Sequence, residues 1–90
     1  MDDKELRKLL QELREEIKKS KVVDEKGRKL LTSLDGDIHD LLEIPENKPI
    51  QVHPSVVQRF KEARYHFEVT HPGLTANLSK LLNSLSTVGL

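Results

Sequence analysis

The stretch RYHFEVTHPGLTANL, residues 64–78, decides the fold, because a single proline separates two apolar stripes within it. Pro72 has no backbone N–H to donate, and in a helix its ring clashes with the carbonyl group four residues earlier. It also biases the preceding residue, His71, away from helical backbone angles. We therefore predict that His71, Pro72 and Gly73 form a corner between two helices, with proline at the favoured first position of the second helix.

Apolar residues recur at steps of three and four along four segments of the chain, which is the spacing of amphipathic helices. The stripes consist of Leu6, Leu10, Leu13 and Ile17; Leu31, Leu34, Ile38 and Leu41; Val56, Phe60, Ala63 and Phe67; and Leu74, Leu78, Leu81, Leu85 and Val88. No segment shows the sustained alternation of apolar and polar residues that marks a strand. The sequence therefore predicts an all-α chain, with helices at about residues 3–20, 25–43, 54–70 and 72–88.

Two connections of different length indicate the topology. The link SKVVD, residues 20–24, is short, so the first two helices should fold back as an antiparallel hairpin. The connector at residues 44–53 lies in the segment IPENKPIQVHP, which contains three prolines and has no helical periodicity. We predict a single domain over residues 1–90, made of two helical hairpins that form a four-helix bundle, which dimerisation can complete.

Composition and charge exclude several classes of function. The 90-residue chain carries 15 basic and 15 acidic residues, so it lacks the basic excess of a dedicated nucleic-acid binder. It has no cysteine, which excludes disulfides, thiolate metal sites and cysteine nucleophiles. Its apolar runs are too short for a membrane span, and its N-terminus is charged rather than signal-like. We expect a soluble cytoplasmic protein.

Two spacings resemble metal motifs without meeting their requirements. In a calcium loop that starts at Asp35, the position that needs glycine for its sharp turn is occupied by Asp40. Glu68 and His71 have the Glu-x-x-His spacing of di-iron bundles, but such sites need a second pair and two further carboxylates. The sequence also contains no glycine-rich phosphate loop and no nucleophile motif. We predict a protein without enzymatic activity and without a cofactor.

Charge is distributed unevenly along the first hairpin. Acidic residues gather at the start of its first helix and at the end of its second, where carboxylates are unfavourable beside the helix dipole. We expect Arg59, Lys61 and Arg64, or the basic tip of a second molecule, to offset them. This basic tip, at the turn of the hairpin, comprises Lys18, Lys19, Lys21, Lys26, Arg28 and Lys29.

A single copy buries only a limited core, so we predict a homodimer that buries more apolar surface. Tyr65 lies off its stripe and is a candidate contact as an exposed aromatic residue, and His66 is expected to be partly exposed beside it. The candidate interface residues are Phe60, Tyr65, Phe67, Leu78, Leu81 and Leu85. The leading hypothesis is a non-enzymatic helical module for oligomerisation and protein interaction. The alternatives are a binder of nucleic acid or of an anionic membrane surface through the basic tip, and a metal-binding helical protein.

Three segments together resemble a known family. They are ELRKLLQELREEI, VDEKGRKLLTSLDGDIHDLLE and RFKEARYHFEVTHPGLTANLSKLLNSLSTVGL. These segments resemble a family of short bacterial proteins catalogued as domain of unknown function 4404, and FEVTHPGLT is the most specific part. The resemblance implies a small, helical, cytoplasmic bacterial protein, and it carries over no catalytic residue, cofactor or partner.

Overall fold

The computed structural model describes the backbone of residues 3–20 and 23–89. Its four helices are α1 (Asp3–Lys19), α2 (Glu25–Leu42), α3 (Pro54–Phe67) and α4 (Pro72–Gly89), and these residues contain no strand. The predicted all-α fold of four helices is confirmed. α3 ends at Phe67 rather than near residue 70, because residues 68–70 form a turn before the proline that starts α4.

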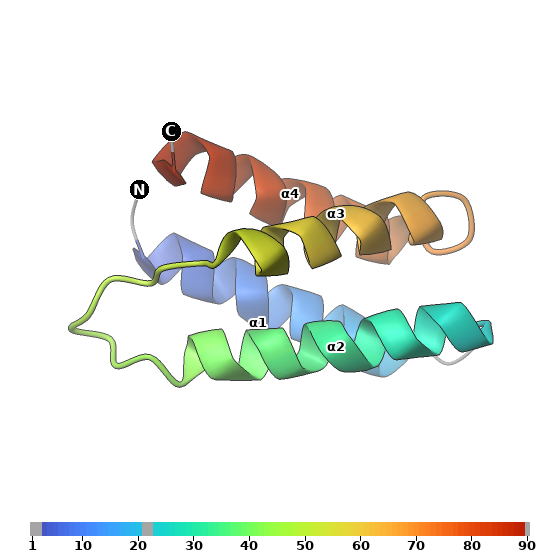
Figure 1. Ribbon diagram of the computed structural model, residues 1–90, viewed down its shortest axis with the longest axis horizontal. Helices are drawn as coiled ribbons and strands as arrows, with labels where there is room; N and C mark the ends of the chain where they lie inside the picture. Colours follow the sequence, from blue (N-terminus) through green and yellow to red (C-terminus); the bar gives the residue numbers. More distant parts are fainter. Residues whose placement is uncertain (1–2, 21–22, 90) are drawn as a thin grey trace.

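Each helix packs against two neighbours, in the cyclic order α1, α2, α3, α4. Successive helices run antiparallel (Figure 1). The link between α1 and α2 therefore lies at the same end of the bundle as the turn between α3 and α4. We call this the corner end, and it comprises residues 20, 23–24 and 68–71. The start of α1, the end of α4 and the connector between α2 and α3 lie at the opposite end.

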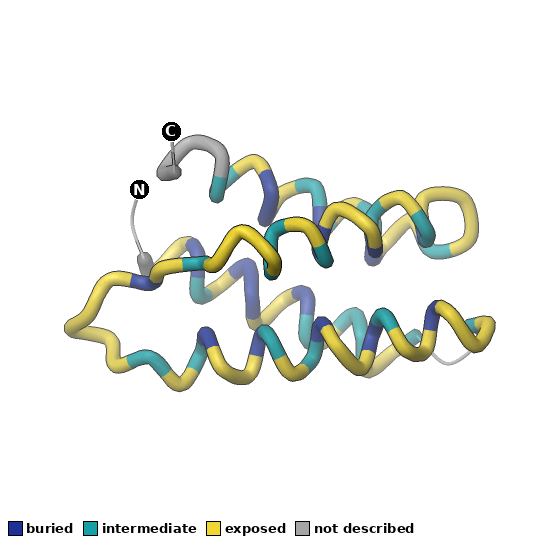
Figure 2. Tube along the Cα trace, in the orientation of Figure 1, coloured by how far each residue is buried: buried dark blue, intermediate teal, exposed yellow. Residues whose placement is uncertain are grey.

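Buried side chains from all four helices form one core cluster. In the trace of Figure 2, the buried positions lie on the sides of the helices that face the inside of the bundle. The largest fully buried side chains are Phe60, Phe67, Leu10, Leu13, Leu34, Ile38, Leu74, Leu78 and Leu81. The connector contributes Ile50 to the same cluster. Arg7 of α1 donates a hydrogen bond from Nη2 to the carbonyl oxygen of Pro45 at 3.0 Å. The connector is thus attached to the bundle by an apolar anchor and by a polar one.

The predicted interface residues, apart from Tyr65, lie inside this core. Four of them are at most 1% exposed: Phe60, Phe67, Leu78 and Leu81. Leu85 is partly buried and packs against the same cluster. These side chains pack against one another within the single chain, and their role at the centre of a dimer surface stays a prediction.

Two helices begin at side chains that satisfy free backbone N–H groups. Asp24 Oδ1 accepts a hydrogen bond from the N–H of Gly27 at 2.7 Å and so caps α2. His53 caps α3 through Nδ1, which accepts from the N–H of Ser55 at 3.1 Å. These short-range bonds explain why α2 and α3 start where they do.

The residues predicted as a corner, His71, Pro72 and Gly73, lie between the end of α3 and the first turn of α4. Pro72 is the first residue of α4, and the carbonyl oxygen of His71 accepts from the N–H of Thr75 at 3.1 Å. The N–H of His71 donates back to the carbonyl oxygen of Phe67 at 2.9 Å. His71 therefore joins the end of one helix to the start of the next.

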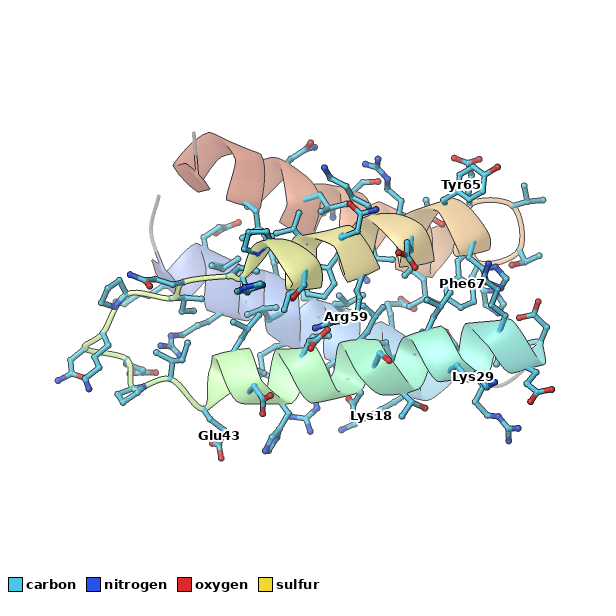
Figure 3. The ribbon with its side chains drawn as sticks, viewed as in Figure 1. Lys18, Lys29, Glu43, Arg59, Tyr65 and Phe67 are labelled. Atoms are coloured by element: carbon cyan, nitrogen blue, oxygen red, sulfur yellow. The ribbon has the colours of Figure 1, made fainter. Side chains whose placement is uncertain are left out.

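Arg59, one of the basic residues expected to offset the acidic end of α2, links α3 to that helix. Its Nε and Nη2 atoms donate to the two carboxylate oxygens of Asp37 at 2.7 and 2.9 Å (Figure 3). This bidentate hydrogen bond is the main cause that raises the pKa of Arg59 above its ordinary value. The offsetting charge for this carboxylate thus comes from within the chain.

Gly27 and Gly36, both in α2, form a matched pair for testing this packing. A Cβ atom at Gly27 would lie 2.7 Å from Asp24 Oδ1 and 3.0 Å from the nearest ring atom of Phe67, whereas one at Gly36 meets nothing within 4 Å. We expect Gly27→Ala to lower the free energy of unfolding by about 1–3 kcal/mol through overpacking. Gly36→Ala should raise it by about 0.5–1 kcal/mol through helix propensity. Urea denaturation of both variants tests this, and equal changes at the two sites would contradict the close packing of Phe67 on α2.

Candidate functional site

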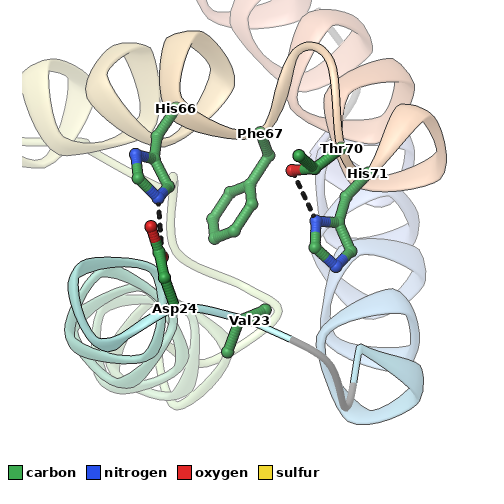
Figure 4. A pocket seen from close by; sticks show the side chains of 6 residues that line it. All are labelled: Val23, Asp24, His66, Phe67, Thr70 and His71. Atoms are coloured by element: carbon green, nitrogen blue, oxygen red, sulfur yellow. Dashed lines mark hydrogen bonds and ion pairs between the residues drawn. The ribbon is translucent and has the colours of Figure 1, made fainter.

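An open pocket of about 510 Å³ lies at the corner end, between the α1–α2 link and the end of α3 (Figure 4). Its lining residues are Val23, Asp24, His66, Phe67, Thr70 and His71. The Phe67 ring makes edge-to-face contacts with the two histidine rings, at centroid distances of 5.0 Å to His66 and 5.2 Å to His71. The pocket thus has an apolar middle with an imidazole on each side.

Asp24 is the polar centre of one side of the pocket. Its Oδ1 lies 2.9 Å from Nε2 of His66, and the same oxygen accepts from the N–H of Gly27. Because a carboxylate only accepts, the imidazole N–H is the donor. The hydrogen bond from His66 lowers the pKa of Asp24 most strongly, followed by the one from Gly27. One oxygen atom therefore caps α2 and ties its start to the end of α3.

The chemistry open to this pocket follows from how its hydrogen bonds are used. An Asp–His pair can orient a general base, but a hydrolytic set also needs a hydroxyl within reach of that histidine. The Thr70 hydroxyl instead lies 2.9 Å from Nδ1 of His71, on the other side of the Phe67 ring. The arrangement positions two helix ends, and among the described residues no hydrogen bond joins a hydroxyl group to His66.

Glu68 and His71, whose Glu-x-x-His spacing alone does not meet the needs of a di-iron site, differ in their surroundings. Glu68 is exposed in the turn, whereas His71 lines the pocket. Among the residues that the structure describes, no three His, Cys, Asp or Glu side chains come close enough together to hold a metal ion.

The basic tip is divided between different faces of the bundle. Lys18 and Arg28 line a groove between α1 and α2, together with Arg14, which sequence reasoning missed. Lys19 lines hollows between α1 and α4 instead. Of the remaining members, Lys26 and Lys29 are exposed on α2, and Lys21 lies outside the described residues.

The outer face of α3 and the turn that follows it carry an exposed apolar pair. Tyr65 is 81% exposed and points away from the bundle (Figure 3), and Val69 is 87% exposed. The sequence predicted an exposed Tyr65 but missed Val69. Its spacing of four residues from Tyr65, together with its position off the apolar stripe, was the signal that could have identified it.

These features define an all-α four-helix bundle with its core closed inside one chain. Within the described part of the chain, none of the helices is both long enough and apolar enough to span a bilayer. The chain belongs to the family described as Domain of unknown function (DUF4404), which it matches over residues 6–90. No curated protein and no solved structure matches it significantly.

The lowered pKa of Asp24 predicts an acid-dependent contribution to stability. Because the folded-state pKa lies below the ordinary value of 3.8, this contribution is fully present above pH 3.8 and is lost as the pH falls through the folded-state pKa. Asp24→Asn keeps a good helix cap but removes the charge. We expect the difference in unfolding free energy between the native protein and Asp24→Asn to shrink steadily below pH 3.8, in urea titrations at a series of pH values.

His66→Ala provides the second half of this test. It removes the largest cause of the lowered pKa of Asp24. In the His66→Ala background, the difference in unfolding free energy between the protein with Asp24 and its Asp24→Asn variant should therefore depend less on pH. A difference that does not change with pH in either background would refute the role assigned to this carboxylate.

Proposed function

We propose that the protein is a non-enzymatic helical module that binds a second copy of itself through the outer face of α3. The observation that carries the proposal is the exposed pair Tyr65 and Val69. Tyr65 lies in the last turn of α3 and Val69 lies in the turn of residues 68–70 that follows it, so the two exposed side chains are close together in the chain. Exposed aromatic residues are frequent anchors of protein interfaces, because a large ring buries much surface at little cost in conformational entropy.

The charges beside this pair are arranged in a self-complementary order. Lys61 lies one turn before Tyr65, and Glu68 is adjacent to Val69, with both charged side chains exposed. If two α3 helices pack antiparallel with Tyr65 near the two-fold axis, Lys61 of each copy lies opposite Glu68 of the other. The formal net charge of zero adds no long-range repulsion between copies. These features favour a second copy as the occupant of this face.

The small size of the apolar pair implies a weak and reversible dimer. Stable dimers bury much larger apolar areas than two side chains from each copy. Because the core closes within one chain, each copy can fold before it associates. The non-enzymatic part of the proposal is supported by the pocket at the corner end, where Asp24 and Thr70 already engage the two histidines.

A nucleic acid or membrane surface has less support as the partner. A polyanion is bound best by cations that share one face, and Lys18 lies on a different side of α1 from Lys19. Fluorescence anisotropy with labelled RNA and DNA at low salt tests this alternative. Elemental analysis of protein purified without a tag tests the metal-binding one. Saturable binding of nucleic acid, or a stoichiometric metal ion, would replace the proposal with the corresponding alternative.

Tyr65→Asp tests the proposed dimer directly. A charge at the two-fold axis places two like charges close together, so we expect the dimer constant to weaken by at least about tenfold with the fold intact. Gln11→Asp adds the same charge on an exposed position of α1, which does not pack against α3, and should leave association unchanged. Sedimentation velocity from micromolar to millimolar protein measures both. A native protein that stays monomeric over this range, or equal weakening by the two variants, would defeat the proposal.

Phe67→Asp should behave in a different way from Tyr65→Asp. Phe67 is 1% exposed, so the variant must bury an unpaired charge or unfold. We expect a loss of unfolding free energy of more than about 4 kcal/mol, which is enough to unfold a domain of this size. Circular dichroism at 25 °C would show loss of helix. A folded Phe67→Asp monomer would instead place this ring at an interface between copies.

A further inference from the structure

A second surface, the groove between α1 and α2, lies apart from the outer face of α3. It encloses about 430 Å³ and is open to solvent along one side. Its apolar residues come from both helices and from the link between them. They are Ile17, Val23 and Leu31. The pairing of α1 and α2 thus leaves a shallow apolar trough on the surface of the bundle.

Three cations surround this trough, and the charge they bring is only partly offset. Arg14 and Lys18 lie on α1 and Arg28 lies on α2, while Asp35 is the one acidic residue among the lining side chains. Asp35 Oδ1 lies 3.5 Å from Nε of Arg14. Among the described residues, neither Lys18 nor Arg28 forms an ion pair, and both are exposed. The groove therefore carries a local excess of positive charge over an apolar floor.

Arg14 adds a polar group whose hydrogen bonding is incomplete. Its side chain is 31% exposed, and its buried Nε atom makes no hydrogen bond, although Asp35 Oδ1 lies 3.5 Å away. Buried donors are normally satisfied, and an unsatisfied one costs stability. A guanidinium with an unused donor is stabilised when an acceptor comes close to it. Its planar group of N–H donors can bond two oxygens of one anion at the same time.

We propose that this groove binds a small amphipathic anion, in which a phosphate monoester or a carboxylate is joined to a short apolar body. The anionic group lies among Arg14, Lys18 and Arg28, and the apolar body covers Leu31 and Ile17. The volume is in the range of small-molecule sites. A nucleic acid fits less well, because no aromatic side chain lines the groove to stack on a base. The proposal does not depend on self-association through Tyr65.

The first experiment uses hexyl phosphate as the probe, with the full chain labelled with ¹⁵N. Inorganic phosphate and hexanol, at the same ionic strength, are the two controls. Phosphate has the anionic group without the apolar chain, and hexanol has the chain without the anionic group. Hexyl phosphate should bind saturably and shift the amide resonances of residues 14–20 and 28–35, and it should bind at least about tenfold more tightly than either half. Equal binding of inorganic phosphate, equal binding of hexanol, or shifts centred on another face would each overturn the proposal.

A pair of double variants separates the groove from charge in general. Lys18→Gln with Arg28→Gln removes two groove cations, and Lys19→Gln with Lys29→Gln removes two neighbouring cations that do not line it. The net charge is the same in both. The groove variant lacks the charged donors of Lys18 and Arg28, so it should lose their hydrogen bonds to the phosphate and bind hexyl phosphate at least about tenfold more weakly. The control should bind like the native protein. Equal weakening of the two would overturn the proposal.

Two further measurements identify the source of the anion and exclude a protein occupant. Phosphatidylcholine vesicles that contain phosphatidic acid present the same phosphate monoester as a lipid headgroup. If the native protein cosediments with these vesicles and the groove variant does not, the anion is a lipid headgroup. If the native protein binds hexyl phosphate but not the vesicles, the anion is a soluble molecule. If sedimentation velocity shows that the groove variant loses self-association, the groove is an interface between copies and the proposal is overturned.

Discussion

The close approach of Phe67 to the first turn of α2 is the contact on which the corner end depends. Gly27 has no side chain, so the Phe67 ring can pack directly against the backbone of α2. A Cβ atom at Gly27 would lie only 3.0 Å from this ring. With the ring in this place, His66 and His71 take positions on either side of it. His66 then reaches Asp24, whose oxygen also caps α2. A glycine, an aromatic ring and one carboxylate oxygen together join the ends of two hairpins.

Closure of the core within one chain determines where function can lie. Because the large apolar side chains are already buried, little apolar surface remains for a partner. Among the described residues, the exposed apolar features are Tyr65 on α3 with Val69 in the turn after it, and the trough beside Leu31 between α1 and α2. One is apolar with flanking charges of both signs, and the other is apolar with an excess of cations. The two surfaces suit different occupants, and α1 and α3 are not neighbours in the bundle.

The fold was predictable from the sequence to a large extent, because its causes are local. Periodic leucines identify the buried face of each helix, and Pro72 breaks the chain between α3 and α4 through backbone chemistry alone. The partner of a buried face is not a local property. Phe60 and Phe67 were correctly read as buried, but periodicity cannot tell a contact within the chain from one between copies. The charge pattern named Arg59 only as one of three basic residues that could offset the acidic end of α2, beside the basic tip of a second molecule, and the structure pairs Arg59 with Asp37.

The candidate sites were less predictable, because they combine residues that lie far apart in the sequence. Asp24 and His66 meet only when two hairpins pack together, and neither residue has a neighbour in the sequence that marks the pair. Arg14 lies beside an apolar stripe and looks like an ordinary solvated charge until α2 is placed next to it. Tyr65 could be recognised because its position off the stripe is a local feature.

The cyclic order of helix packing has a consequence for how the chain folds. Three of its four packed pairs join helices that follow one another in the sequence, and only α1 with α4 joins distant segments. Short-range contacts can form quickly, because little loop entropy is lost in making them. Each hairpin can therefore assemble from neighbouring segments. The packing of α1 against α4 is the long-range step that completes the bundle, and it carries the loop-entropy cost that the fold's topology imposes.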